Sequence, residues 1–299
     1  MGTILEITLV GRPGEISRDD LDPLFAEVQR LEAIFTRYDD ASALSLLNAA
    51  SGAGPRTVAP ELADILADCV RYAELTRGRF DVTVGPLVEL WRAAARRDRV
   101  PAPVQVAATR DRVGAAKLRL LPDAQVDLSR GMAVDLDGVA KGWALDRLAH
   151  RLREEDVAGA LLDFGGSSVV ALGAPPGEEG WRTLLRDTES GAAGTLVLRD
   201  RALAVSGSLG QWTTIAGRRY GHVIDPQSGE PMTRAFQAVV VAPTGGEAEA
   251  WTKALLVLGA EEGLALVAAR PGVEGMLVDE EGRRFTTPGF REAAGFEAL

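Results

Sequence analysis

The sequence has little of the chemistry that marks disulfide-bonded, metal-thiolate or nucleic-acid-binding proteins. Among 299 residues there is one cysteine, Cys69, so a disulfide and a thiolate metal site are excluded by number. The formal net charge is −10 and no basic stripe interrupts it, which argues against a phosphate backbone as partner. Histidine is also scarce, with two copies, His150 and His222. We therefore expect a protein that does not bind nucleic acid, with Cys69 as a small buried thiol.

Long hydrophobic runs are missing as well. No stretch approaches the roughly 18 uninterrupted apolar residues of a membrane-spanning helix. The segment from Met1 to Ile7 has neither a basic n-region nor a long apolar h-region, so no signal peptide is visible. We expect a soluble, cytoplasmic protein without a membrane span, although an export segment removed beforehand would leave the same sequence.

The apolar residues alternate between helical and extended spacing along the chain. Strands are expected at 4–10 and 158–162 and in short pieces over 168–242, and helices at 17–35, 60–78, 138–153, 247–258 and 261–269. A capping box at Ser17 and Asp20 is expected to start the first of these helices. Strand and helix do not alternate regularly, which favours an α+β fold with mixed, largely antiparallel sheets and packed helices. We expect one domain over 1–299, with a small excursion at about 98–126 where the sequence is polar and broken by proline.

A candidate phosphate site lies in the segment 134–142. Here a short strand is expected to run into the start of a helix that carries Gly138 and Lys141. Free backbone N–H groups, the positive end of the helix dipole and an ammonium together favour a bound phosphate. A capped helix start with a solvated lysine would give the same pattern, so the residues alone leave both interpretations open.

Two further segments carry polar side chains of possible chemical use. His222 precedes the turn 225–229, where an imidazole could act as a base or bind phosphate, and where a structural histidine fits equally well. Glu249 and Lys253 are four residues apart near the start of a helix, a spacing that by itself indicates a surface ion pair. Rossmann, Walker A, H-E-x-x-H and G-x-S-x-G motifs are all missing.

Taken in order, several segments resemble the successive motifs of the ApbE family of FAD:protein FMN transferases. They are Met1-Gly2-Thr3, Tyr38…Ser45…Asn48, Phe80-Asp81-Val82-Thr83-Val84-Gly85-Pro86-Leu87, Asp135…Ala140-Lys141-Gly142, Asp163…Gly165-Gly166, His222-Val223-Ile224-Asp225-Pro226 and Glu249…Leu258-Gly259. The resemblance implies an ApbE-like fold with FAD as the donor. It implies a reaction that attaches FMN covalently to a Thr or Ser of an acceptor protein while AMP leaves. The acceptor would carry an Asp-x-x-Ser/Thr-Gly/Ser-Ala-Ser/Thr segment.

The resemblance also implies roles for individual residues. Met1 and Tyr38 would flank the isoalloxazine ring, as a thioether and an aromatic face are suited to do. The other FAD-binding residues would be Asn48, Asp81, Val82, Thr83, Asp135, Lys141 and Ile224. Gly138, through its carbonyl, and Glu249 would hold a Mg²⁺ ion that bridges to the pyrophosphate. His222 would accept the proton of the attacking hydroxyl.

One pair of residues departs from the family pattern. The family usually has Asp and, four residues later, Thr on this helix, where the present chain has Glu249 and Lys253. A protonated lysine has no lone pair to offer a metal. Three interpretations stay open: Lys253 replaces part of the metal's charge and is catalytic, Thr252 supplies the missing metal ligand, or the protein binds FAD without transferring FMN. Hydrolysis of FAD to FMN and AMP, with water in place of the acceptor, is a further alternative.

Overall fold

A seven-stranded sheet lies at the centre of the computed structural model, which describes residues 2–11, 18–155, 157–186, 193–207, 212–234 and 236–298. Its order is β1-β5-β6-β9-β12-β13-β14, and every neighbouring pair is antiparallel. These strands are β1 (Leu5–Val10), β5 (Gly159–Phe164), β6 (Ser168–Gly173), β9 (Arg201–Gly207), β12 (Gln237–Ala242), β13 (Glu274–Val278) and β14 (Arg284–Thr286). The predicted α+β class with antiparallel sheets is confirmed.

Three small sheets accompany the central one, in the orders β2-β4-β3, β15-β8-β7 and β10-β11. Their strands are β2 (Arg56–Thr57), β3 (Arg119–Leu121), β4 (Gln125–Asp127), β7 (Trp181–Leu185), β8 (Gly194–Leu198), β10 (Trp212–Ile215), β11 (Arg218–Gly221) and β15 (Glu297–Ala298). The stretch expected to form an excursion, 98–126, contains a short helix, a 3₁₀ turn, β3 and the start of β4.

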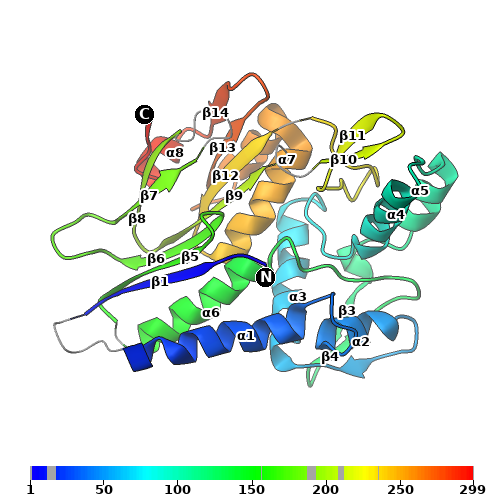
Figure 1. The fold of residues 1–299 in the computed structure, drawn as a ribbon, viewed down its shortest axis with the longest axis horizontal. Coiled ribbons are helices and arrows are strands. Elements are labelled where there is room, and N and C mark those ends of the chain that lie inside the picture. The colour runs from blue at the N-terminus through cyan, green and yellow to red at the C-terminus, as the bar shows by residue number, and fades with distance from the viewer. Residues whose placement is uncertain are drawn as a thin grey trace.

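Helices cover one face of the central sheet (Figure 1). The α-helices are α1 (Asp22–Phe35), α2 (Ala43–Ala49), α3 (Pro60–Leu75), α4 (Gly85–Arg96), α5 (Pro103–Arg110), α6 (Ala140–Glu154), α7 (Gly245–Ala268) and α8 (Phe290–Ala293). The 3₁₀ helices are η1 (Arg18–Asp20) and η2 (Ala115–Lys117). Figure 1 shows α4 and α5 grouped with β10 and β11 away from the central sheet. None of the helices in the described ranges is long and apolar enough to span a bilayer.

The core follows from side-chain alternation along the strands. In β12, Ala238 and Val240 face the cluster that contains α1, α3, α6 and α7, whereas Val239 and Val241 face a second cluster under β7 and β8. Because both faces of β12 are covered, all six of its residues are buried, and those after Gln237 form a continuous apolar run. Cys69 is buried within the first cluster and is a free thiol, as predicted.

The longest helix, α7, is interrupted at Gly259. This residue has φ 76° and ψ −171°, values outside the helical region that glycine adopts without a Cβ penalty. The helix therefore consists of two pieces, in agreement with the two predicted helices at 247–258 and 261–269. Its N-terminal piece, which starts at Gly245, is the one that approaches α6.

Two local predictions differ from the structure. Helix α1 begins at Asp22 with Leu21 as N-cap and no side-chain cap; Ser17 of the expected capping box lies outside the described residues, and Asp20 belongs to η1. The short strand expected after residue 133 is wrong. Asn48 donates to Val134 O at 2.9 Å and accepts from Val134 N at 2.7 Å, so a side chain takes the backbone groups that a partner strand would use.

Candidate functional site

The first turns of α6 and α7 touch each other (Figure 1). A Cβ added to Gly142 would lie 2.3 Å from the carbonyl oxygen of Gly245, so backbone meets backbone at this point. Asp146 on α6 accepts hydrogen bonds from Gly245 N at 2.6 Å and from Gly246 N at 2.9 Å, which satisfies free N–H groups at the start of α7. Burial raises the pKa of Asp146 to about 7 against the opposing effect of these two bonds. The contact fixes the distance between the two helix starts.

Two lysines flank the place where the helices meet. Lys141, on the first turn of α6, donates to Ser167 Oγ at 2.5 Å. Lys253, on α7, has its Cε 3.4 Å from where a Cβ on Gly138 would lie. Within the described part of the chain Lys253 makes no hydrogen bond or ion pair. Burial lowers the pKa of Lys253, the charge of Glu249 opposes that change, and the charge of Lys141 adds to it.

Glu249 is a buried carboxylate with half of its hydrogen-bonding capacity unused. Its side chain lies one turn before Lys253 on α7 and the residue is 2% exposed. Oε1 accepts a hydrogen bond from Ser168, whereas Oε2 has no partner among the residues that the structure describes. An unpaired buried oxygen of a charged group is costly, so this oxygen is a candidate contact for a bound ligand, ion or water.

Thr252 turns its hydroxyl into the protein. The residue is fully buried, and its Oγ1 donates to the carbonyl of Glu249 at 2.7 Å and lies 2.9 Å from Ser206 Oγ. Both interactions tie the hydroxyl to α7 and β9. Thr252 therefore lies next to Glu249 on α7, but its hydroxyl oxygen already has partners inside the protein.

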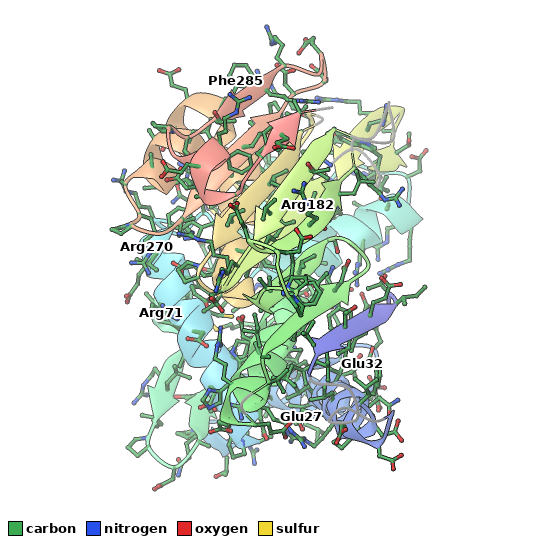
Figure 2. The ribbon with its side chains drawn as sticks, turned by 90° about the vertical axis from the view of Figure 1, so that its left-hand side faces the viewer. Glu27, Glu32, Arg71, Arg182, Arg270 and Phe285 are labelled. Atoms are coloured by element: carbon green, nitrogen blue, oxygen red, sulfur yellow. The ribbon has the colours of Figure 1, made fainter. Side chains whose placement is uncertain are left out.

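A cavity of about 450 Å³ opens beside Lys141. Its lining includes Gly2, Glu32, Tyr38 and Asp137, and Figure 2 shows Glu32 on α1. The Tyr38 side chain is 70% exposed, and its hydroxyl donates to Asp137 Oδ2 at 2.9 Å. An exposed aromatic face and an ammonium thus border the same space, which suits a ligand with a planar ring and a phosphate.

Asp135 is held in place by an ion pair and by hydrogen bonds. Arg37 forms an ion pair with Asp135 and another with Glu89, and Asp135 also accepts a hydrogen bond from Asp137 N at 2.9 Å. Asp135 N donates to Val82 O at 2.7 Å, which ties the predicted residues Asp135 and Val82 together. Burial, followed by the charge of Asp135, raises the pKa of Asp137. Asp135 therefore anchors the loop that presents Asp137 and Gly138.

Asp81 and Thr83 form an internal network. Asp81 Oδ1 accepts from Thr83 N at 2.8 Å and from Thr83 Oγ1 at 2.6 Å, and its Oδ2 accepts from Ala115 N at 2.7 Å. Thr83 Oγ1 accepts from Gly114 N at 2.7 Å. Both side chains are buried. These hydrogen bonds hold the 81–83 segment against the 114–115 segment. Direct binding of FAD by Asp81, Thr83 or Asn48 stays a prediction.

Three further predicted residues are His222, Ile224 and Met1. His222 is exposed on the segment directly after β11. Ile224 forms an isolated bridge with Pro231 and packs against the cluster that contains Leu87 and Trp91. Met1 lies outside the described residues.

A larger cavity, of about 780 Å³, occupies another part of the molecule. It lies between the Gly259 kink and the β13–β14 hairpin, and its lining includes Arg234 and Phe285. Figure 2 shows Phe285 and Glu27 at opposite ends of the view, with Phe285 far from α1. None of the predicted site residues lines this cavity. Volume alone therefore does not identify the site, and the smaller cavity is the better candidate.

The arrangement agrees with the comparisons to known proteins. The pattern of the ApbE family matches residues 1–277. The chain belongs to the ApbE family. A relative from Salmonella typhimurium named FAD:protein FMN transferase is 30% identical over 298 residues, which cover 96% of this chain and 84% of the relative.

Solved structures show the same ApbE fold. The flavin transferase ApbE of Vibrio cholerae is 26% identical with a TM-score of 0.85, and the match covers 98% of this chain and 96% of the other. The apbe protein of Thermotoga maritima, at 24% identity, has a TM-score of 0.86 over 98% of this chain and 96% of its own. The ApbE-like fold implied by the sequence motifs is confirmed.

Two serines that contact predicted site residues were missed in the sequence. Ser167 binds Lys141 and Ser168 binds Glu249, so two consecutive serines contact α6 and α7. Both follow Gly165 and Gly166, whose φ values of 61° and 68° suit the tight turn between β5 and β6. The double glycine marked the turn, but nothing in the serines' spacing indicated their partners.

Proposed function

We propose that this chain transfers the FMN part of FAD to a Thr or Ser hydroxyl of an acceptor protein and releases AMP. One observation carries the proposal: Tyr38, Asp137 and Lys141 line one cavity, and Lys253 of α7 lies against Gly138, the residue after Asp137. A flavin ring suits the first of these residues, and a diphosphate suits the lysine at the helix start. The name of the Salmonella relative, which matches almost the whole chain, supports the same reaction.

The reaction is a phosphoryl transfer. The acceptor hydroxyl oxygen forms a bond to the FMN phosphorus, and the bond from that phosphorus to the bridging oxygen breaks, so AMP leaves with the electron pair. Lys141 and the N-terminus of α6 hold the diphosphate, and Tyr38 covers the ring. We assign the hydroxyl proton to His222, because an imidazole is basic enough near neutral pH and lies exposed to an incoming acceptor.

The donor set fits a resident Mg²⁺ ion poorly. Mg²⁺ requires close to six oxygen ligands in octahedral geometry. The described residues contain no group of three or more His, Cys, Asp or Glu side chains suited to a metal. Thr252 has internal partners, and a lysine borders Gly138. Magnesium bound through Gly138, Glu249 and Thr252 stays a prediction.

The reaction is tested with FAD and a peptide that carries an Asp-x-x-Thr-Gly-Ala-Thr segment. We expect the peptide to gain the mass of FMN less one water and to retain flavin fluorescence after denaturation, with AMP released in equal amount. The matched peptide with alanine in place of the first Thr should gain nothing. AMP release without acceptor would show a hydrolase, and FAD binding without AMP release would show a flavin-binding protein; each result would reject transfer.

The role of His222 has its own test and a matched control. His222→Ala should slow transfer on the order of 100-fold, because a general base typically contributes that much or more, while FAD binding stays within twofold. His150→Ala removes the other histidine, which pairs with Glu154 on the exposed end of α6, and should transfer at the wild-type rate. Equal rates for the two variants would remove His222 from the mechanism.

A further inference from the structure

We propose that the Lys253 ammonium takes the place of a metal ion at the diphosphate, so that FMN transfer proceeds without a divalent cation. The inference rests on the proposed function and specifies how its site handles charge. It starts from the disagreement between the donor set and Mg²⁺, and it assigns the cation to a side chain of this chain.

The position of Lys253 is the first argument. Its Cε lies in van der Waals range of the Gly138 position, at 3.4 Å from a Cβ built there, on the loop that leads into α6. Within the described ranges its ammonium has no hydrogen bond or ion pair. A half-buried ammonium without a partner is as unusual as a half-used carboxylate, and both occur here one helical turn apart.

Glu249 supplies the second argument. Its Oε2 is buried and unpaired, on the same face of α7 as Lys253. A diphosphate placed beside Lys141 and Lys253 would repel the Glu249 carboxylate unless a cation lay between them. An ammonium offers three N–H donors, enough to serve the carboxylate and phosphate oxygens together.

Lysine usage is the third argument. The chain has three lysines, Lys117, Lys141 and Lys253, against thirty arginines. Lys117 donates to the backbone carbonyls of Asp111 and Val113. Lys141 lies on the first turn of α6, and Lys253, on α7, borders the loop that leads into α6, although arginine is by far the commoner base in the chain. A compact ammonium fits where a small cation is needed and a planar guanidinium is too large.

The chemistry needs no co-reactant. As the bond between the FMN phosphorus and the bridging oxygen breaks, negative charge grows on that oxygen and leaves with AMP. The Lys253 ammonium lies beside this charge and stabilises it without giving up a proton. The acceptor proton goes to His222 as before, so the atoms and charges balance without a metal.

The binding experiment uses FAD alone and needs no acceptor. The dissociation constant of FAD is measured by quenching of flavin fluorescence, in EDTA and in Mg²⁺. For the wild-type protein we expect the two values to agree within twofold. In EDTA, Lys253→Met should weaken FAD binding roughly tenfold, because a charge-assisted bond to phosphate is lost. Arg199→Met removes one positive charge from an exposed position and should leave the constant unchanged.

The transfer experiment compares rates in EDTA and in Mg²⁺ with the acceptor peptide. The wild-type rates should differ by less than about twofold. The double variant Glu249→Asp with Lys253→Thr restores an oxygen pair of the family type, and its rate should rise more than about tenfold when Mg²⁺ replaces EDTA. Thermal unfolding of each variant confirms that it is folded.

The outcomes separate the inference from the proposed function. Wild-type transfer that stops in EDTA and returns with Mg²⁺ overturns the ammonium role and leaves the transferase intact. Absence of transfer in both conditions overturns the transferase, and the binding experiment then decides the ammonium role by itself. Tighter FAD binding in Mg²⁺ than in EDTA, with no loss in Lys253→Met, counts against Lys253 in either case.

Discussion

At the residue scale, Tyr38 offers a sharp test of flavin binding because its ring is 70% exposed and adds little to the core. Tyr38→Ala should raise the dissociation constant of FAD roughly tenfold, as expected for the loss of one aromatic stacking contact. The free energy of unfolding should change by less than about 0.5 kcal/mol, because exposed positions tolerate substitution. Fluorescence titration and urea unfolding measure the two quantities.

The matched variant at this position is Tyr38→Phe. It keeps the ring and removes the hydroxyl that donates to Asp137 at 2.9 Å. Its dissociation constant should stay within about threefold of the wild-type value if the ring carries the interaction. Equal losses in Tyr38→Ala and Tyr38→Phe would mean that the hydroxyl, and not the aromatic face, is what FAD requires.

At the scale of elements, the contact between α6 and α7 sets the distance between the first turns of the two helices. Gly142→Ala would place a Cβ 2.3 Å from the carbonyl oxygen of Gly245, and backbone on both sides leaves little room to yield. The free energy of unfolding should fall by about 3 kcal/mol, as for an overpacked core position. Gly138→Ala is the control, because its Cβ would meet only the mobile Cε of Lys253 at 3.4 Å, and it should cost less than about 1 kcal/mol. Similar losses in both variants would show that this contact is looser than the structure indicates.

Asp146 makes the same contact sensitive to pH. Burial raises its pKa to about 7, above the ordinary value of 3.8 that applies to the unfolded chain. The folded state therefore holds a proton that the unfolded state has lost, and this stabilisation disappears as the pH rises from 4 through 7. Asp146→Asn does not titrate. The wild-type free energy of unfolding, taken relative to Asp146→Asn, should fall between pH 5 and pH 8, by at most about 3 kcal/mol. A difference in unfolding free energy between wild type and Asp146→Asn that stays constant or rises with pH would contradict this role of Asp146.

At the scale of the whole molecule, the sequence predicted the fold class and several helices and strands, but it missed α2, α4 and α5 and the contacts between elements. The break in α7 was predictable because Gly259 separates two apolar helical patterns, and the antiparallel class followed from the lack of regular alternation. The strand expected after residue 133 failed because Asn48, 86 positions away, replaces a strand partner with its side chain. The expectation that residues 1–299 form one domain stays a prediction.

The candidate site shows the same limit. Lys141, Lys253 and Glu249 were identified from their sequence segments, but their proximity depends on the approach of Gly142 to Gly245, which no local pattern encodes. Ser167 and Ser168 were missed because serine is common in turns and carries no periodic signal. The internal bonds of Asp81 were equally invisible, since the backbone N–H of Ala115 becomes its partner only after folding.

The scarcity of lysine has a practical consequence for handling this protein. Dyes, biotin esters and sensor surfaces that react with amines have three lysine side chains to modify, and two of them border the proposed diphosphate site. A label on Lys141 or Lys253 would remove the charge that binds the diphosphate. The labelled protein would then fail to bind its ligand and would be mistaken for inactive material. Coupling through the 43 Asp and Glu residues spreads the attachment over the surface and is the safer chemistry for binding measurements.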